Sequence, residues 1–145
     1  MSAFAVYPRQ KWTRSMKRSV ELGAEFYLER ELHKQGARYG PWYRFHYPTH
    51  YYYDLLAGLD FITALGYGDD RRLRYAILLL KKKRRHDGKW ILDAVHPDVE
   101  GGMKQWYEKN PKRKPTPFAF ETQGEPSKMV TLRAMQVLKR LKNST

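Results

Sequence analysis

The chain contains no cysteine. This absence excludes disulfide bonds, thiolate nucleophiles and cysteine-ligated zinc sites. Long apolar runs are missing too, since no window approaches the roughly 18 apolar residues of a transmembrane helix. The apolar run near the N-terminus is also too short for a secretory signal. We therefore expect a cytoplasmic protein.

Acidic residues are scarce. The sequence has 15 Asp and Glu against 28 Lys and Arg, a net charge of +13 over 145 residues. The excess is concentrated in residues 71–89, which hold nine Lys or Arg side chains and a single acid, Asp87. A basic protein attracts polyanions such as nucleic acid, an anionic membrane or an acidic partner. The length favours one domain, residues 1–145, with one core.

Apolar periodicity predicts four long helices and no convincing strand. We expect an irregular segment at 1–12 and a loop-rich insertion at about 91–126, which five prolines interrupt and which could hold one short helical turn near 102–109. The predicted helices cover residues 14–34, 49–65, about 70–85 and 127–142.

Local signals mark the ends of these helices. Pro48 suits a first helical turn, and Gly66 suits the left-handed residue that follows a helix. Asp69 or Asp70 should cap the third helix, and Ser127 should cap the last. The apolar residues of the last helix cover a broad arc, so we expect that helix to be well buried.

Two Gly–Trp corners suggest a repeated unit. Residues 42–90 read as a loop, a helix, a tight turn, a second helix and then Asp87-Gly88-x-Trp90. The earlier Gly40-Pro41-Trp42 reads as the end of a preceding copy. The sequence therefore predicts stacked helix pairs that turn at equivalent places.

The second corner resembles the repeat of prenyltransferases and squalene cyclases. That repeat has a small residue, an aromatic–aliphatic pair, a Gln and then Gly-x-Trp, and Ala76, Leu79-Leu80 and Gly88-x-Trp90 have the corresponding spacing. Arg84 stands in the Gln position, and Leu79 replaces the aromatic residue.

Further stretches carry the same resemblance. Residues 47–72 and 126–134 are similar to one group of terpenoid-cyclase-like toroid proteins, so the resemblance covers about residues 14–142. It implies an all-α fold, in which helical hairpins form part of an α/α toroid and correspond to a C-terminal fragment of that family. In such a ring, the inner helices would line a central cavity.

The resemblance does not carry an activity to this chain. There is no Asp-x-Asp-Asp box like that of the squalene cyclases, and no cysteine for the zinc site of the prenyltransferases. The family's full ring has about six hairpins, whereas this chain has two to two and a half, and a short array leaves an apolar edge. We therefore expect a homo-oligomer or a partner protein that covers this edge.

The first candidate site surrounds the predicted start of the second helix, where a polar ligand could bind against an aromatic wall. In the alternative interpretation, the tyrosines pack between helices and the aspartate caps a helix or pairs with an arginine. Because Pro48 interrupts the helix, a metal site at His46, His50 and Asp54 is not expected, and we predict no metal and no cofactor. The predicted ligand-binding residues are His46, Tyr47, His50, Tyr51, Tyr53 and Asp54.

The second candidate site is the basic run at the end of the third helix, where cations also meet the negative end of the helix dipole. It could bind a polyanion, or it could be an ordinary solvated helix end. The adjacent carboxylates of Asp69 and Asp70 are explained by capping. The predicted polyanion-binding residues are Lys81, Lys82, Lys83, Arg84 and Arg85.

The leading hypothesis is a non-catalytic helical-repeat module that binds a partner protein or a ligand, such as a small apolar molecule, through the aromatic surface around Tyr47–Asp54. One alternative is an enzyme or subunit that acts on isoprenoids or lipids in a cavity completed by other chains. Another is a basic nucleic-acid-binding module. No catalytic residue can be named, since no phosphate loop, nucleophile elbow or Ser/His/Asp order is present.

Overall fold

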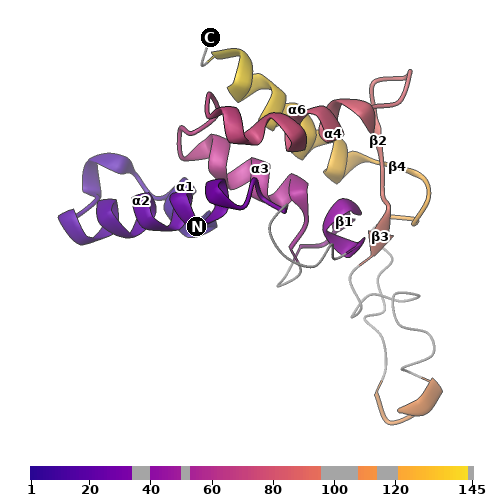
Figure 1. Cartoon of the computed structure of the whole chain (residues 1–145). Helices are drawn as coiled ribbons and strands as arrows, with labels where there is room; N and C mark the ends of the chain where they lie inside the picture. Colours follow the sequence, from indigo (N-terminus) through magenta and orange to yellow (C-terminus); the bar gives the residue numbers. More distant parts are fainter. Residues whose placement is uncertain (34–39, 50–52, 96–107, 114–120, 144–145) are drawn as a thin grey trace.

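The computed structural model describes residues 1–33, 40–49, 53–95, 108–113 and 121–143 (Figure 1). Helices dominate this part of the chain, and short strands flank the later helices. In chain order, the elements are α1 (Ser2–Val6), η1 (Arg9–Lys11), α2 (Arg14–Glu29), η2 (Gly40–Tyr43), β1 (His46–Tyr47), α3 (Leu55–Ala64), η3 (Arg71–Leu73), α4 (Arg74–Lys82), β2 (Trp90–Ile91), β3 (Ala94–Val95), β4 (Pro126–Ser127) and α6 (Lys128–Asn143).

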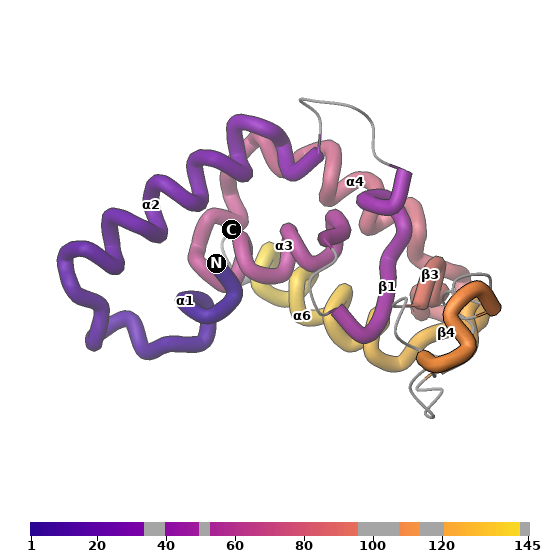
Figure 2. Tube along the Cα trace, turned by 90° about the horizontal axis from the view of Figure 1, so that it is seen from below, coloured from indigo at the N-terminus to yellow at the C-terminus, as the bar shows by residue number. Residues whose placement is uncertain are grey.

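Helix α3 forms the centre of the molecule. The helices α1, α4 and α6 all pack against it (Figure 2). Seven of its ten residues are buried, so α3 is apolar on nearly every side. Burial of this kind is typical of a helix enclosed by the rest of the fold.

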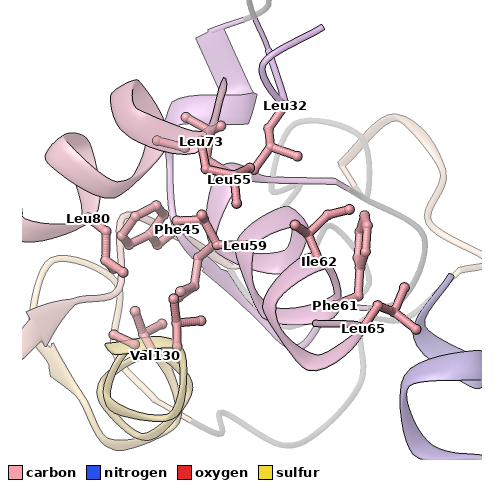
Figure 3. Close-up of a cluster of buried hydrophobic side chains, with 14 of the residues drawn as sticks. Leu32, Phe45, Leu55, Leu59, Phe61, Ile62, Leu65, Leu73, Leu80 and Val130 are labelled. Carbon is pink, nitrogen blue, oxygen red and sulfur yellow. The ribbon is translucent and has the colours of Figure 1, made fainter. Parts of the chain in front are cut away.

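The hydrophobic core surrounds α3 and draws residues from every other major element. In Figure 3, Leu59 points toward Val130 of α6, while Phe61 and Ile62 lie on a neighbouring side of the helix. Leu32, Phe45, Leu73 and Leu80 complete the wall around α3. Each of these side chains is nearly inaccessible to water, and each contributes roughly 1.5–3 kcal/mol by burial.

Two small sheets correct the predicted all-α fold, which is wrong. β1 pairs in parallel with β3, and β2 pairs antiparallel with β4, so that Trp90 lies opposite Ser127. The second pairing ties the chain after α4 to the start of α6. Each strand has only two residues, which is too short for an alternating pattern to be visible in the sequence.

The N-terminal segment is also more regular than expected. We predicted an irregular segment at 1–12, but α1 and η1 form there. The indole of Trp12 donates a hydrogen bond to the Tyr7 carbonyl (3.1 Å), and the Phe4 ring lies edge-on to Trp12. Five- and three-residue helices are stabilised by such tertiary contacts rather than by a sequence period.

The first two long helices are shorter than predicted. Helix α2 ends at Glu29 instead of residue 34, because Glu31 and Leu32 adopt positive φ angles and Leu32 enters the core. Helix α3 begins at Leu55 instead of near Thr49, because the Asp54 carboxylate caps it by accepting a hydrogen bond from the Ala57 N–H (2.7 Å). Tertiary burial and a stronger capping residue override the predicted boundaries.

Several local predictions are confirmed. Gly66 follows α3 with a φ of 90°. Asp70, rather than Asp69, caps the next helical segment by accepting a hydrogen bond from the Arg72 N–H (2.9 Å), although the segment starts as a 3-10 turn. Ser127 Oγ accepts a hydrogen bond from the Val130 N–H (2.9 Å) at the start of α6. The short helix proposed near 102–109 lies mostly outside the described residues.

The expectation that the last helix is well buried holds for only part of its surface. Val130, Ala134 and Val137 are buried, but 57% of Met135 and 51% of Leu132 are exposed. The broad apolar arc is wider than the strip that α3 and β2 cover. One side of α6 therefore presents apolar side chains to the surface.

Trp42 and Trp90 do not occupy equivalent positions. Trp42 is a half-buried residue of η2 and lies edge-on to Tyr53. Trp90 lies in β2, is 1% exposed and donates an indole hydrogen bond to the Leu80 carbonyl (2.8 Å). The prediction of two helix pairs that turn at equivalent Gly–Trp corners is therefore wrong for the described chain.

Candidate functional site

The predicted aromatic and histidine site has a structural role in the part that the structure describes. Asp54 is 1% exposed, and its carboxylate accepts hydrogen bonds from the backbone N–H groups of His46 (3.0 Å) and Ala57 (2.7 Å). The His46 ring nitrogen Nδ1 lies 2.6 Å from the same carboxylate. These contacts connect β1 to the start of α3. His50 and Tyr51 lie outside the described residues, so ligand binding here stays a prediction.

Tyr53 belongs to an aromatic cluster that joins α2 to α3. Its ring stacks on Tyr27, and its hydroxyl donates a hydrogen bond to the Leu32 carbonyl (2.9 Å). Tyr27 in turn lies edge-on to Phe61. Burial raises the pKa of the Tyr53 phenol far above its usual value, so this hydroxyl stays protonated. Tyr47 packs against the core from β1.

The predicted basic run splits into two groups. Lys83 donates a hydrogen bond to the Asp93 carboxylate (2.7 Å), and the Arg85 guanidinium contacts Asp87 (3.3 Å). These two cations are engaged with the protein itself. Lys81, Lys82 and Arg84 are exposed. The second group can therefore interact with a partner.

A groove of about 790 Å³ separates α4 from α6. Both helices pack on α3 (Figure 1). The residues that line the groove come from the end of α4, from β2 and from the second half of α6. Its volume lies within the range typical of binding sites, which is about 300–1,000 Å³. The lining residues are Lys81, Arg84, Trp90, Met135, Leu138, Lys139, Leu141 and Lys142.

Trp90 is the fixed part of the groove wall. Its backbone N–H donates a hydrogen bond to the Thr131 hydroxyl (3.0 Å), and its indole N–H donates one to Leu80. The Arg84 guanidinium lies 5.7 Å from the centre of its ring. Hydrogen bonds from the indole and from the backbone therefore fix Trp90 as a rigid base beneath the groove.

The groove is strongly basic. Four of its eight lining residues are Lys or Arg, and none is acidic. The nearby acids are used elsewhere, since Asp60 pairs with Arg140 (2.6 Å) and Asp93 pairs with Lys83. The Lys89 backbone N–H donates to Asp87 and lowers the pKa of that carboxyl group, which therefore stays ionised beside Arg85. The cations that line the groove thus attract anions.

Sequence reasoning found only one side of this groove. Lys81 and Arg84 belong to the predicted basic run, but nothing in the sequence linked them to Lys139 and Lys142 of the last helix. Met135 belongs to the apolar arc of that helix, which was expected to be buried. A helix that carries both a broad apolar arc and terminal lysines could have signalled the groove, but only once α6 was known to lie beside α4.

A smaller hollow of about 370 Å³ lies at the other end of α4, beside Tyr75 and Leu78. Arg72 borders it and is held by Asp70 (2.8 Å) and Glu25 (2.5 Å). Hydrogen bonds from Arg72 lower the pKa of both carboxyl groups, and they raise the pKa of the guanidinium. This cluster fastens α2 to η3, which is a structural role.

Glu121 also has a role that the sequence did not reveal. Its carboxylate accepts hydrogen bonds from the backbone N–H groups of Lys128 (2.7 Å) and Met129 (3.2 Å), and it also contacts the Ser127 hydroxyl. An acid at this position stabilises the positive end of the α6 dipole. Glu121 thus fixes the helix that forms one wall of the groove.

Comparison of the chain with models of protein families, with curated proteins and with solved structures finds no match. The resemblance to the prenyltransferase and squalene cyclase repeat therefore stays a prediction. Within the described ranges, no helix is long and apolar enough to span a bilayer. No group of three His, Asp or Glu side chains is placed to hold a metal ion in that same part of the chain.

Proposed function

We propose that this chain is a non-catalytic binding module, and that the groove between α4 and α6 binds one amphipathic helix with an acidic polar face from a partner protein. The observation that carries this proposal is the composition of the groove. Apolar side chains line it together with four cations, and no acid lies among its lining residues.

The shape of the groove favours a helix as the ligand. Met135, Leu138 and Leu141 follow one another at one-turn spacing along α6. From Met135 to Lys142, this wall extends over about 10 Å, or two helical turns, at 1.5 Å per residue. A helix that lies between two others would place residues at i, i+3 and i+7 against such a row. The polarizable Met135 side chain can adjust to different apolar partners.

The charges set the polarity of the partner. Lys81 and Arg84 lie on the α4 side, and Lys139 and Lys142 lie on the α6 side. A helix seated between them can direct a carboxylate toward each side while its apolar stripe faces Met135, Leu138 and Leu141. Such complementarity accelerates association and excludes basic partners, and its effect weakens as salt is added.

The same geometry argues against nucleic acid as the ligand. Single-stranded nucleic acid binds through bases stacked on exposed aromatic rings. Trp90 is only 1% exposed, so its ring cannot receive a stacked base. The basic run alone would provide only non-specific attraction.

The test uses three labelled peptides of about two heptads each. The first has Leu at the a and d positions and Glu elsewhere. The second has the same composition, shuffled so that no apolar stripe forms. The third replaces each Glu with Lys. Fluorescence anisotropy should show binding of the first peptide, with affinity at least about tenfold weaker for the other two.

Variants of the protein locate the binding site. Lys81→Gln/Lys139→Gln and, separately, Met135→Asp should each weaken binding of the Leu/Glu peptide by at least about tenfold. The matched control Lys11→Gln/Lys112→Gln removes two exposed charges outside the groove and should leave the affinity unchanged. Equal binding of the ordered and shuffled peptides would overturn the proposal. So would tighter binding of oligothymidylate or of phosphatidylserine vesicles that the groove variants abolish.

A further inference from the structure

Helix α2 carries its charges in the reverse of the order that its own dipole favours. Arg14, Lys17 and Arg18 lie within its first five residues, and Glu21, Glu25 and Glu29 follow them toward its C-terminal end. No acid lies in its first turn and no base in its last. Since anions stabilise a helix N-terminus and cations a C-terminus, this order disfavours the isolated helix at each end.

The outward face of α2 also exposes two large apolar side chains. Leu22 is 54% exposed and Phe26 is 50% exposed, and they lie one turn apart on the side opposite the buried Val20, Ala24 and Leu28. Leu22 lies at the middle of the sixteen-residue helix. The apolar spot is therefore central, with basic residues toward one end of the helix and acidic residues toward the other.

Contacts within the chain leave most of these charges available. Arg18 approaches Glu21 only at 3.8 Å, and Arg30 approaches Glu29 only at 3.9 Å, in pairs whose side chains are 43–69% exposed. Exposed pairs of this kind contribute little. Of the acids on α2, Glu25 alone has a close partner in another described element, Arg72.

We infer that α2 is a self-association surface, and that it pairs antiparallel with α2 of a second copy of this chain about a two-fold axis near Leu22. This arrangement places residues 15–19 of one copy opposite residues 25–29 of the other. Each basic half then faces an acidic half, and the Leu22 and Phe26 side chains of both copies meet at the centre. A single patch that complements itself is what a two-fold interface requires.

The second copy explains the reversed charge order. A charge pattern that is unfavourable for one helix becomes favourable when an antiparallel helix supplies the opposite sign at each end. Both views place α2 at the end of the molecule away from β4 (Figures 1 and 2). No residue of α2 lines the α4–α6 groove, so self-association leaves the groove accessible. One pair of helices buries less surface than the roughly 1,200–2,000 Å² of a standard interface, so the dimer should be weak.

The test measures mass against protein concentration by sedimentation velocity. The wild type should form a dimer whose dissociation constant rises with salt. Arg18→Glu adds an acid to the segment that faces Glu25 and Glu29 of the second copy, and Glu29→Arg adds a base to the segment that faces Lys17 and Arg18 of the second copy. Each variant alone should associate at least about tenfold more weakly than the wild type. An equimolar mixture of the two should recover the dimer, because each pair is then complementary.

Further variants keep this test decisive. Leu22→Ser should weaken the dimer without loss of helix by circular dichroism, since this side chain is exposed in the monomer. Met135→Ser, which alters the groove instead, should leave the dimer unchanged. A monomeric wild type at all concentrations would overturn the inference. So would a mixture that associates no better than its components, or a dimer that depends on Met135 and not on Leu22.

Discussion

Charged side chains near α3 and charged side chains along the α4–α6 groove have opposite surroundings. Beside α3, the Asp54 carboxylate accepts two backbone hydrogen bonds, and Asp60 contacts both Arg140 (2.6 Å) and Arg133 (3.5 Å). In the groove, Lys81 and Lys139 face no acid among the lining residues. The first region uses charge to hold the fold together, and the second leaves charge available for a partner.

Because of this difference, the structure favours the basic run as a binding site, whereas the sequence favoured residues 46–54. The histidines, tyrosines and aspartate at residues 46–54 were predicted to bind a ligand. Those that the structure describes cap a helix or pack between elements. The basic run looked like a solvated helix end, yet two of its residues line a groove. Burial with satisfied hydrogen bonds indicates structure, whereas exposed like charges around an apolar surface indicate binding.

The substitution with the largest expected effect on stability is Asp54→Ala. The substitution leaves the buried N–H groups of His46 and Ala57 and the His46 ring without their acceptor, and it should lower the free energy of unfolding by about 4 kcal/mol. Urea denaturation measures the loss. Asp69→Ala, at an exposed position, should change stability by less than about 0.5 kcal/mol. Similar small losses of unfolding free energy in both variants would show that Asp54 does not hold the fold together.

The second test adds a methyl group to the centre of α3. A Cβ at position 58 would overlap the Tyr53 hydroxyl, which is held by Leu32 and by its ring contacts with Tyr27 and Trp42. Gly58→Ala should therefore destabilise the protein by about 2 kcal/mol despite the better helix propensity of alanine. In a Tyr53→Phe background, Gly58→Ala should destabilise the protein less, because the hydroxyl oxygen that overlaps the new Cβ is absent. Thermal denaturation of the wild type, the two single variants and the double variant measures the coupling energy between positions 53 and 58.

Lys82 and Lys83 are adjacent in the sequence but have different surroundings, and smaller changes in stability are expected at both. Lys83 donates to Asp93 and lies 5.0 Å from the centre of the Phe45 ring, so Lys83→Gln should cost about 1 kcal/mol of stability. Lys82 is exposed at the end of α4, and Lys82→Gln should be neutral or slightly stabilising because it relieves repulsion among neighbouring cations. Equal effects at the two positions would mean that the basic run is not divided into structural and available residues.

The smallest expected effect is the pH dependence of the stability that Arg72 provides through Asp70 and Glu25. Arg72 lowers the pKa of Asp70 and of Glu25, so both acids stabilise the folded state above their unfolded pKa values of about 4. This stabilisation is lost as the pH falls through the lowered folded pKa values. The wild type should therefore be more stable than Arg72→Gln at neutral pH, and the two curves should converge in acid. A difference that stays constant down to low pH would show that the carboxylates are not involved.

Local signals in the sequence were enough to place several helix ends. Gly66 and Ser127 adopt the predicted roles because a left-handed turn and an N-terminal cap depend on a few adjacent residues. The start of α3 was predicted near Thr49, although Asp54, which the alternative interpretation of the first site treated as a cap, accepts the Ala57 N–H at the true start. The two-residue strands depend on pairing between distant segments, which no local period records.

The groove could be predicted only in part, for the same reason. The basic run identified Lys81 and Arg84, but their relation to Lys139 requires α4 and α6 to pack on a common helix. Trp90 was noted as a corner residue and not as part of a groove wall. Its position depends on β2 pairing with β4 at the start of α6.

The most direct test of the central claim is an amide chemical-shift titration by nuclear magnetic resonance, with the Leu/Glu peptide added to the full chain. The account predicts saturable shifts in two segments, residues 81–90 and 135–142, which are reduced in Lys81→Gln/Lys139→Gln. Shifts concentrated instead around Tyr47 and Asp54, or spread evenly over all exposed lysines, would contradict it.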